Sequence, residues 1–185
     1  MSKVTFIAIV GLTLTTLVAC GSSDNVEARP APQGEALNVS LARSYASLDE
    51  VVQGSDAVVK VRAGRATTEE IGEIVFTFTA VEILDTVTGQ LGSKEIQVVQ
   101  TGERGSWYVP ELPPFLRQGD EYYLAVASVD DFYDIVGTAA WVVDGTQAEL
   151  YAWEAEGATV DGESGVELPQ TLPVDELEDQ IRNAG

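Results

Sequence analysis

The chain has 185 residues, of which 10 are basic and 30 acidic, and it contains no histidine and a single cysteine. The net charge of −20 excludes nucleic acid as a partner, because phosphate contacts require a basic surface. The lack of histidine and of a second cysteine excludes Cys/His zinc sites, histidine-dependent catalytic triads and disulfides within the chain. We therefore expect no metal site and no cofactor.

Residues 1–19 have the pattern of an export signal. Lys3 supplies a positive start, and the run from Val4 to Ala19 carries no charge. This run is short for a membrane span, which takes roughly 20 apolar residues, but it suits a removable signal peptide. The residues Leu17-Val18-Ala19-Cys20 resemble the lipobox of bacterial lipoproteins. The resemblance implies cleavage before Cys20 and lipidation of Cys20; the alternative is a plain secreted protein.

The resemblance also implies a location. Lipoproteins of this type carry two or three acyl chains, which hold a protein stably, whereas one chain binds only marginally. We therefore expect an extracytoplasmic protein anchored to the outer face of a bacterial membrane through Cys20. Residues 20–40 are small and polar and contain Pro30, Pro32 and Gly34, which predicts a flexible tether. Residues 41–185 suit a single β-rich domain.

The domain begins with a predicted helix over residues 47–54. Ser47 and Glu50 have the spacing of a capping box, and Gly54 is suited to end the helix in a left-handed conformation. Strand patterns dominate the following residues. The sequence predicts a turn over 67–72 and strands over 59–63, 74–84, 96–101, 122–126, 133–137, 141–143 and 148–153.

Three local features refine this pattern. The apolar phase of 74–84 runs through positions 74, 76 and 78 and then shifts to 81 and 83, which predicts a bulge in that strand. Asp144-Gly145 is typical of a two-residue hairpin turn. Residues 173–182 predict a C-terminal helix with Pro173 at its start. The expected fold is mostly β, as a small OB-type barrel or alternatively a β-sandwich, with one short helix before it and one after it.

Several segments together resemble a group of extracytoplasmic proteins from Gram-positive bacteria, especially actinobacteria. More remotely, they are similar to the netrin-like modules of tissue inhibitors of metalloproteinases, which are OB-type barrels. The segments that carry the resemblance are 47–50, 55–59, 76–84, 96–102 and 119–124. The inhibitors chelate zinc through a free amino-terminal cysteine and rely on disulfides. Since Cys20 would carry lipid and no second cysteine exists, the resemblance implies the barrel but not the inhibition.

The segment from Gly102 to Gly119 is the best candidate for a binding site. It joins two predicted strands, and loops of that length are often functional. Aromatic residues and arginine are the usual anchors of binding surfaces, and OB-type barrels bind near such loops. The candidate partner-binding residues are Arg104, Trp107, Tyr108, Phe115 and Arg117. In the alternative interpretation, Phe115 and Leu116 plug the end of the barrel and the prolines stiffen the loop.

Two further groups have structural explanations that compete with functional ones. Trp141, Tyr151 and Trp153 could form an exposed stripe for sugars or peptides, although cross-strand pairing in the sheet is the commoner arrangement. The carboxylates of Asp130, Asp131 and Asp134, and those of Asp161, Glu163 and Glu167, could hold calcium. Neither carboxylate group has the spacing of a calcium loop.

The sequence thus predicts a non-catalytic, lipid-anchored accessory module that binds a protein, a wall polymer or a small ligand outside the membrane. One alternative is a hydrolase of cell-wall polymers that uses two carboxylates. Another is an acidic structural protein that buffers cations at the surface.

Overall fold

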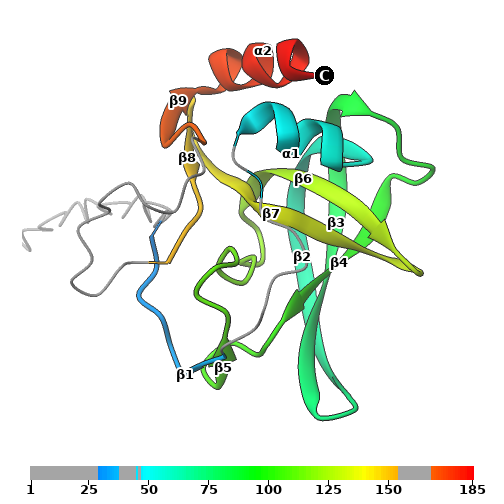
Figure 1. The fold of residues 1–185 in the computed structure, drawn as a ribbon, viewed down its shortest axis with the longest axis vertical. Coiled ribbons are helices and arrows are strands. Elements are labelled where there is room, and N and C mark those ends of the chain that lie inside the picture. The colour runs from blue at the N-terminus through cyan, green and yellow to red at the C-terminus, as the bar shows by residue number, and fades with distance from the viewer. Residues whose placement is uncertain (1–28, 38–44, 46, 154–167) are drawn as a thin grey trace, which may run out of the picture.

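The computed structural model describes residues 29–37, 45, 47–153 and 168–185, and most of them lie in strands. Two helices complete the fold (Figure 1). The strands are β1 (Glu35–Ala36), β2 (Ala57–Ile71), β3 (Ile74–Gly89), β4 (Glu95–Thr101), β5 (Trp107–Tyr108), β6 (Glu121–Val129), β7 (Phe132–Asp144), β8 (Gln147–Leu150) and β9 (Thr171–Pro173). The helices are α1 (Leu48–Gly54) and α2 (Val174–Ala184). The predicted mostly β fold with two flanking helices is confirmed.

Seven strands form one sheet in the order β4-β3-β2-β6-β7-β8-β9, and all neighbours in that order are antiparallel. β4 also pairs with β7 in parallel, through Val98 with Tyr133 and Val99 with Asp134. This pairing links β4, β3, β2, β6 and β7 into a ring, which is the order that an OB-type barrel requires. The closing contact is only two residue pairs long, so the barrel itself stays a prediction.

The sheet packs on both of its faces. One face holds the strand core, which includes Val61, Val81, Val98, Leu124 and Tyr151. The other face holds the helix core, where α1 and α2 cover the sheet (Figure 1). The helix core includes Val51, Tyr123, Trp141, Leu177 and Ile181.

The predicted turn over 67–72 is wrong. Residues 67–71 belong to β2, and the chain reverses only at Gly72 and Glu73, where Gly72 has a φ of 69°. Thr67 and Thr68 pair with Phe78 and Thr77 on β3. β-branched threonine suits a strand, and this pairing overrides the polar, turn-like composition of the segment.

The phase change in 74–84 has a different cause from the predicted one. β3 does have a bulge within the predicted strand, at Leu84, where one step from Lys60 to Val61 opposes two steps from Asp85 to Ile83. Opposite the phase change itself the extra residue lies on β2, where three steps from Ala63 to Ala66 oppose two steps from Val81 to Thr79. On β3, Thr77 and Thr79 are buried on the same face as Val81. Two threonines therefore occupy interior positions that a hydrophobic pattern assigns to the surface.

The two predicted strands 133–137 and 141–143 are parts of one strand, β7. Between Leu124 and Val126 of β6, the partner on β7 moves from Ala140 to Ile135, so β7 bulges over the intervening residues. Gly137 lies in this bulge with a φ of 58°. That left-handed conformation favours glycine. Because glycine is also typical of turns, the sequence pattern divided this single strand into two.

Helix α1 begins as predicted, because the Ser47 side chain accepts a hydrogen bond from the backbone N–H of Glu50 at 3.3 Å. Its end differs from the prediction, since Gly54 does not adopt a positive φ and the following Ser55 is extended. A Cβ at position 54 would lie 2.6 Å from a ring carbon of Tyr45. Gly54 is therefore required for close packing against Tyr45 and not for a left-handed cap.

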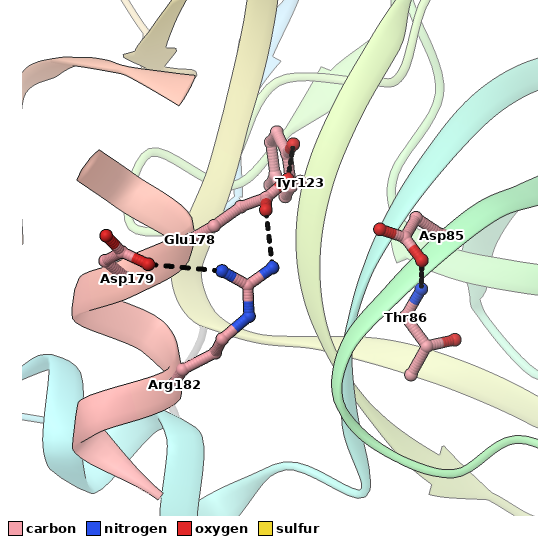
Figure 2. A network of polar contacts seen from close by, with 6 residues as sticks. All are labelled: Asp85, Thr86, Tyr123, Glu178, Asp179 and Arg182. Atoms are coloured by element: carbon pink, nitrogen blue, oxygen red, sulfur yellow. Dashed lines mark hydrogen bonds and ion pairs between the residues drawn. The ribbon is translucent and has the colours of Figure 1, made fainter. Parts of the chain in front are cut away.

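Helix α2 packs through one apolar face and is held by a polar network at its edge. Leu177, Ile181 and Ala184 are buried in the helix core. Figure 2 shows Glu178 between Tyr123 and Arg182. The Tyr123 hydroxyl donates to Glu178 Oε1 at 2.5 Å, and Arg182 donates to Glu178 Oε2 at 2.6 Å.

Part of the predicted tether is ordered against the domain. Glu35 and Ala36 form β1, which pairs in parallel with β5. Within the described ranges, no helix combines the length and the apolar character needed to cross a bilayer. Cys20, the signal sequence and the lipobox lie outside the described residues.

Candidate functional site

The candidate loop starts at a glycine that no other residue could replace without strain. Gly102 has a φ of 108°, and a Cβ there would lie 2.6 Å from the carbonyl oxygen of Trp107. The chain then reverses tightly, with the N–H of Glu103 and the carbonyl of Trp107 bonded at 2.9 Å, and the reciprocal bond also at 2.9 Å. The loop therefore has internal structure from its first residues.

The middle of the loop is fixed by β1. The N–H of Glu35 donates to the Ser106 carbonyl at 2.9 Å, and the N–H of Leu37 donates to the Tyr108 carbonyl at 2.7 Å. These bonds hold Trp107 and Tyr108 in an extended conformation. The predicted loop therefore contains a short strand, β5. No local pattern indicates this strand, because a two-residue parallel pairing joins segments about 70 positions apart.

The second half of the loop packs into the strand core. Phe115 and Leu116 are buried. The buried Gln100 side chain donates to the Pro113 and Pro114 carbonyls at 3.3 and 3.0 Å, and it accepts from the Leu116 N–H at 3.1 Å. Phe115 and Leu116 thus follow the alternative interpretation, in which they close the end of the sheet. Gln100 was missed because a polar residue near the end of a strand looks like a surface position.

The two arginines lie near opposite ends of the loop, and each makes a contact that stabilises it. Arg104 Nη2 donates to the carbonyls of Phe115 and Leu116 at 2.9 and 3.2 Å. The Arg117 guanidinium lies 5.8 Å from the ring centre of Tyr151, in a cation–π arrangement. Both cations therefore stabilise the fold of the loop, and the exposed Arg104 also borders its surface.

Two buried tyrosines support this end of the sheet. The Tyr151 hydroxyl donates to the Phe115 carbonyl at 3.0 Å. The Tyr122 hydroxyl accepts from the Arg117 N–H at 3.0 Å and donates to Asp120 Oδ2 at 3.3 Å. Burial raises the pKa of both Tyr122 and Tyr151 above the ordinary tyrosine value. Both hydroxyls are therefore neutral near pH 7 and act as hydrogen-bond donors.

The aromatic side chains of the loop divide into packed and exposed ones. The Tyr108 ring lies 4.9 Å from Trp153, and Phe115 lies 6.1 Å from the same indole. The Trp153 indole N–H also donates to the Val109 carbonyl at 3.2 Å. Trp107 points outward and keeps 37% of its surface exposed. The structure therefore brings the five predicted residues to one end of the sheet, and Trp107 is the exposed aromatic among them.

The proposed aromatic stripe on the 141–153 segment does not form. Trp141 is buried in the helix core, where its indole N–H donates to the Pro169 carbonyl at 2.8 Å. Tyr151 is buried in the strand core. Tyr151 and Trp153 both contact the candidate loop, Tyr151 through Phe115 and Arg117 and Trp153 through Tyr108 and Val109. Their distance in sequence from that loop explains why the pattern did not reveal these contacts.

A groove of about 270 Å³ runs between the candidate loop and strand β2. We call it the loop groove. Arg104 and Glu103 line one side of it, and Thr67 and Thr68 line the other. The remaining lining residues are Ala66, Thr77, Phe115 and Leu116.

The acidic candidates differ in their surroundings, and burial raises the pKa of one of them, Asp134, above the ordinary aspartate value. Among the described residues, no three histidine, cysteine, aspartate or glutamate side chains come close enough together to hold a metal ion. Asp130 and Asp131 form the turn between β6 and β7, and Asp134 follows on β7; Asp161, Glu163 and Glu167 lie outside the described residues. A glycosidase pair needs one carboxyl group in apolar surroundings. Glu95 and Asp131 share a shallow hollow of about 610 Å³, but both are exposed.

Comparison with known proteins adds no assignment to this geometry. No protein-family model matches the chain, and a search of curated proteins finds no match.

Proposed function

We propose that the protein is a non-catalytic binding module, held outside the membrane by lipid on Cys20, that binds its partner at the face formed by the candidate loop. The observation that carries this proposal is the exposed Trp107 on a backbone fixed by β1. Tryptophan is enriched among residues that dominate binding energy. A side chain held on an ordered backbone also loses less entropy when a partner binds.

The remaining candidate residues either contact the partner or support the loop that presents Trp107. Arg104 borders the loop groove and offers its exposed cationic surface beside Trp107. Tyr108 and Arg117 orient the loop through Trp153 and Tyr151. Phe115 supports the loop from beneath, because its side chain is buried. We therefore place direct contact with the partner on Trp107 and Arg104.

Crosslinking in the native host tests the proposal. The full chain and a Trp107→Ala variant would be crosslinked in intact cells, and the captured proteins and polymers would be quantified. Leu84→Ala is a matched control, because Leu84 is also a large apolar side chain and is 36% exposed, compared with 37% for Trp107. We expect Trp107→Ala to lose most of one specific partner, and Leu84→Ala to retain it.

Equal capture by both variants would refute the loop face as the binding site. Recovery of no partner by any of the three proteins would refute a stable macromolecular interaction. Trp107 is chosen over the arginines because Arg104 holds two loop carbonyls, so its removal would perturb the fold of the loop.

A further inference from the structure

Strand β2 has a free edge beside the loop groove. Along residues 57–62, β2 lies between β3 and β6. The last contact on the β6 side joins Ala63 to Gly119 and Asp120, through two backbone hydrogen bonds of 2.8 and 2.9 Å. From residue 64 to residue 71, β3 is the only strand among the described residues that pairs with β2. Figure 1 shows the β2–β3 hairpin extending past β6.

A bulge and a glycine mark the start of this free edge. The bulge on β2 lies between Ala63 and Ala66, where the strand leaves β6. Gly64 permits this path, since a Cβ there would lie 2.8 Å from the Ala80 carbonyl oxygen. A free edge presents unpaired N–H and C=O groups that can pair with another chain. Proteins protect such edges with proline, charged side chains or bulges. Residues 64–71 contain no proline, but they carry Arg65, Glu69 and Glu70 beside the bulge, so selective pairing requires a partner that complements these charges.

The loop groove lies on one face of this edge. Ala66 pairs with Thr79, and Thr68 pairs with Thr77. Paired residues point to the same face of the sheet, and the two β3 threonines are buried. Ala66 and Thr68 therefore lie on the face that carries the strand core. Both are small side chains, and they form the β2 side of the groove. An added strand places alternate side chains on each face. Every second side chain of such a strand would therefore enter the groove toward Phe115 and Leu116.

The charges around the edge favour a basic occupant. Glu69 and Glu70 lie on opposite faces of β2, and Glu103 borders the groove. No described residue forms an ion pair with any of these three carboxylates. Two cations lie nearby: Arg65 is on the edge itself, and Arg104 of the groove already donates to the carbonyls of Phe115 and Leu116. The three carboxylates still outnumber these two cations.

We propose that residues 64–71 of β2 take up an extended, basic segment of a partner protein as an additional strand, with alternate side chains in the loop groove. This inference rests on the proposed binding function and specifies its partner as a polypeptide. A regular row of backbone N–H and C=O groups matches another peptide backbone, which is the basis of strand addition. A wall polysaccharide has no such row.

Hydrogen exchange measured by mass spectrometry on the full chain tests the proposal with defined probes. The first probe is a blocked peptide of alternating lysine and valine, as long as the free edge. The second is the same peptide with an N-methyl group on every residue, which removes the backbone donors along both of its edges. The third replaces lysine with glutamate. We expect the first probe to slow exchange at 64–71 at least tenfold, and the other two to have no such effect.

A pair of matched variants tests the charge argument. Because the register of the added strand is unknown in advance, Glu69→Gln and Glu70→Gln are combined to cover both faces of β2. The lysines of the probe lie on one face of the added strand, so only one of the two glutamates pairs with them. One exposed ion pair contributes up to about 1 kcal/mol, so the double variant should bind the first probe about twofold to fivefold more weakly. The control is Glu95→Gln combined with Glu111→Gln, which removes two exposed carboxylates outside the groove and should leave the affinity unchanged.

Three results would overturn strand addition, and the crosslinking experiment shows whether the binding function fails with it. Equal binding of the N-methylated peptide, or protection that excludes 64–71, would overturn strand addition. Lack of binding by the lysine–valine peptide would overturn it as well. If Trp107→Ala also abolishes capture of a partner in cells, the binding function stands and only the edge is wrong. If neither experiment detects binding, both proposals fail.

Discussion

The contact between Tyr123 and Glu178 should make a measurable and pH-dependent contribution to stability. Tyr123 lies in the helix core, and its hydroxyl reaches Glu178 on α2 at 2.5 Å (Figure 2). This hydrogen bond is the main cause that lowers the pKa of Glu178 below its usual value. Arg182 lowers the pKa further, while partial burial opposes both effects. Replacing Tyr123 with phenylalanine removes the donor and keeps the ring.

The expected magnitude follows from the chemistry of the bond. A hydrogen bond to a charged group contributes about 1.5–3 kcal/mol. Arg182 still contacts the other oxygen of Glu178 at 2.6 Å in the variant, so the carboxylate keeps a partner. We therefore expect Tyr123→Phe to lower the free energy of unfolding by about 1–2 kcal/mol near neutral pH.

The sign of the pH dependence follows from the lowered pKa of Glu178. A carboxyl group with a lower pKa in the folded state stabilises the protein above its unfolded pKa. That contribution is lost as the pH falls through the folded pKa. The difference between wild type and Tyr123→Phe should therefore shrink by about half in acid, once the pH is below the lowered pKa of Glu178, because a neutral carboxyl group keeps only the weaker hydrogen bond.

Urea unfolding near neutral pH and in acid measures these differences. Tyr133→Phe is the matched control, since no described residue forms a hydrogen bond with its half-buried hydroxyl. A double-mutant cycle with Glu178→Gln isolates the pairwise energy. A loss as small as that of the control near neutral pH would refute the reasoning, and so would a loss that is unchanged in acid.

Three further outcomes follow from other parts of the molecule. Gly102→Ala should disorder the candidate loop, because a Cβ there meets the Trp107 carbonyl. Tryptophan fluorescence and Trp107-dependent capture should both change. Unchanged signals would contradict this role of Gly102. Leu177→Ala should cost about 2–5 kcal/mol in urea unfolding, since Leu177 is buried in the helix core; a loss below about 1 kcal/mol would contradict that packing. Cys20→Ser should release the protein from the membrane fraction, and retention there would refute lipid anchoring.

Local signals in the sequence predicted local structure well. Ser47 lies three residues before Glu50, and its side chain caps α1 through contacts within one turn. Leu177 and Ile181 are four positions apart, and this spacing alone indicates the buried face of α2. In each of these elements, the residues that determine the conformation are near neighbours in the chain.

Other features depended on contacts that no local pattern contains. The parallel pairing of β4 with β7 joins Val98 to Tyr133, and β1 reaches β5 across the whole first half of the domain. Buried Gln100 looks like a surface residue until the carbonyls of Pro113 and Pro114 are placed beside it. The sequence indicates a connection between two strands at 102–119, but the division of its residues between support and surface needed the structure.

The helix core also has a consequence for the synthesis of the protein. Val51 and Val52 of α1 meet Leu177 and Ile181 of α2 in that core, although more than 120 residues separate them. While the ribosome is still translating the strands, α1 is already available to cover Trp141 and Tyr123, but α2 is not. The helix core can be completed only after residue 184 has left the ribosome. Until then the apolar surface that α2 covers is exposed, and surface of that kind makes an incomplete chain prone to aggregation.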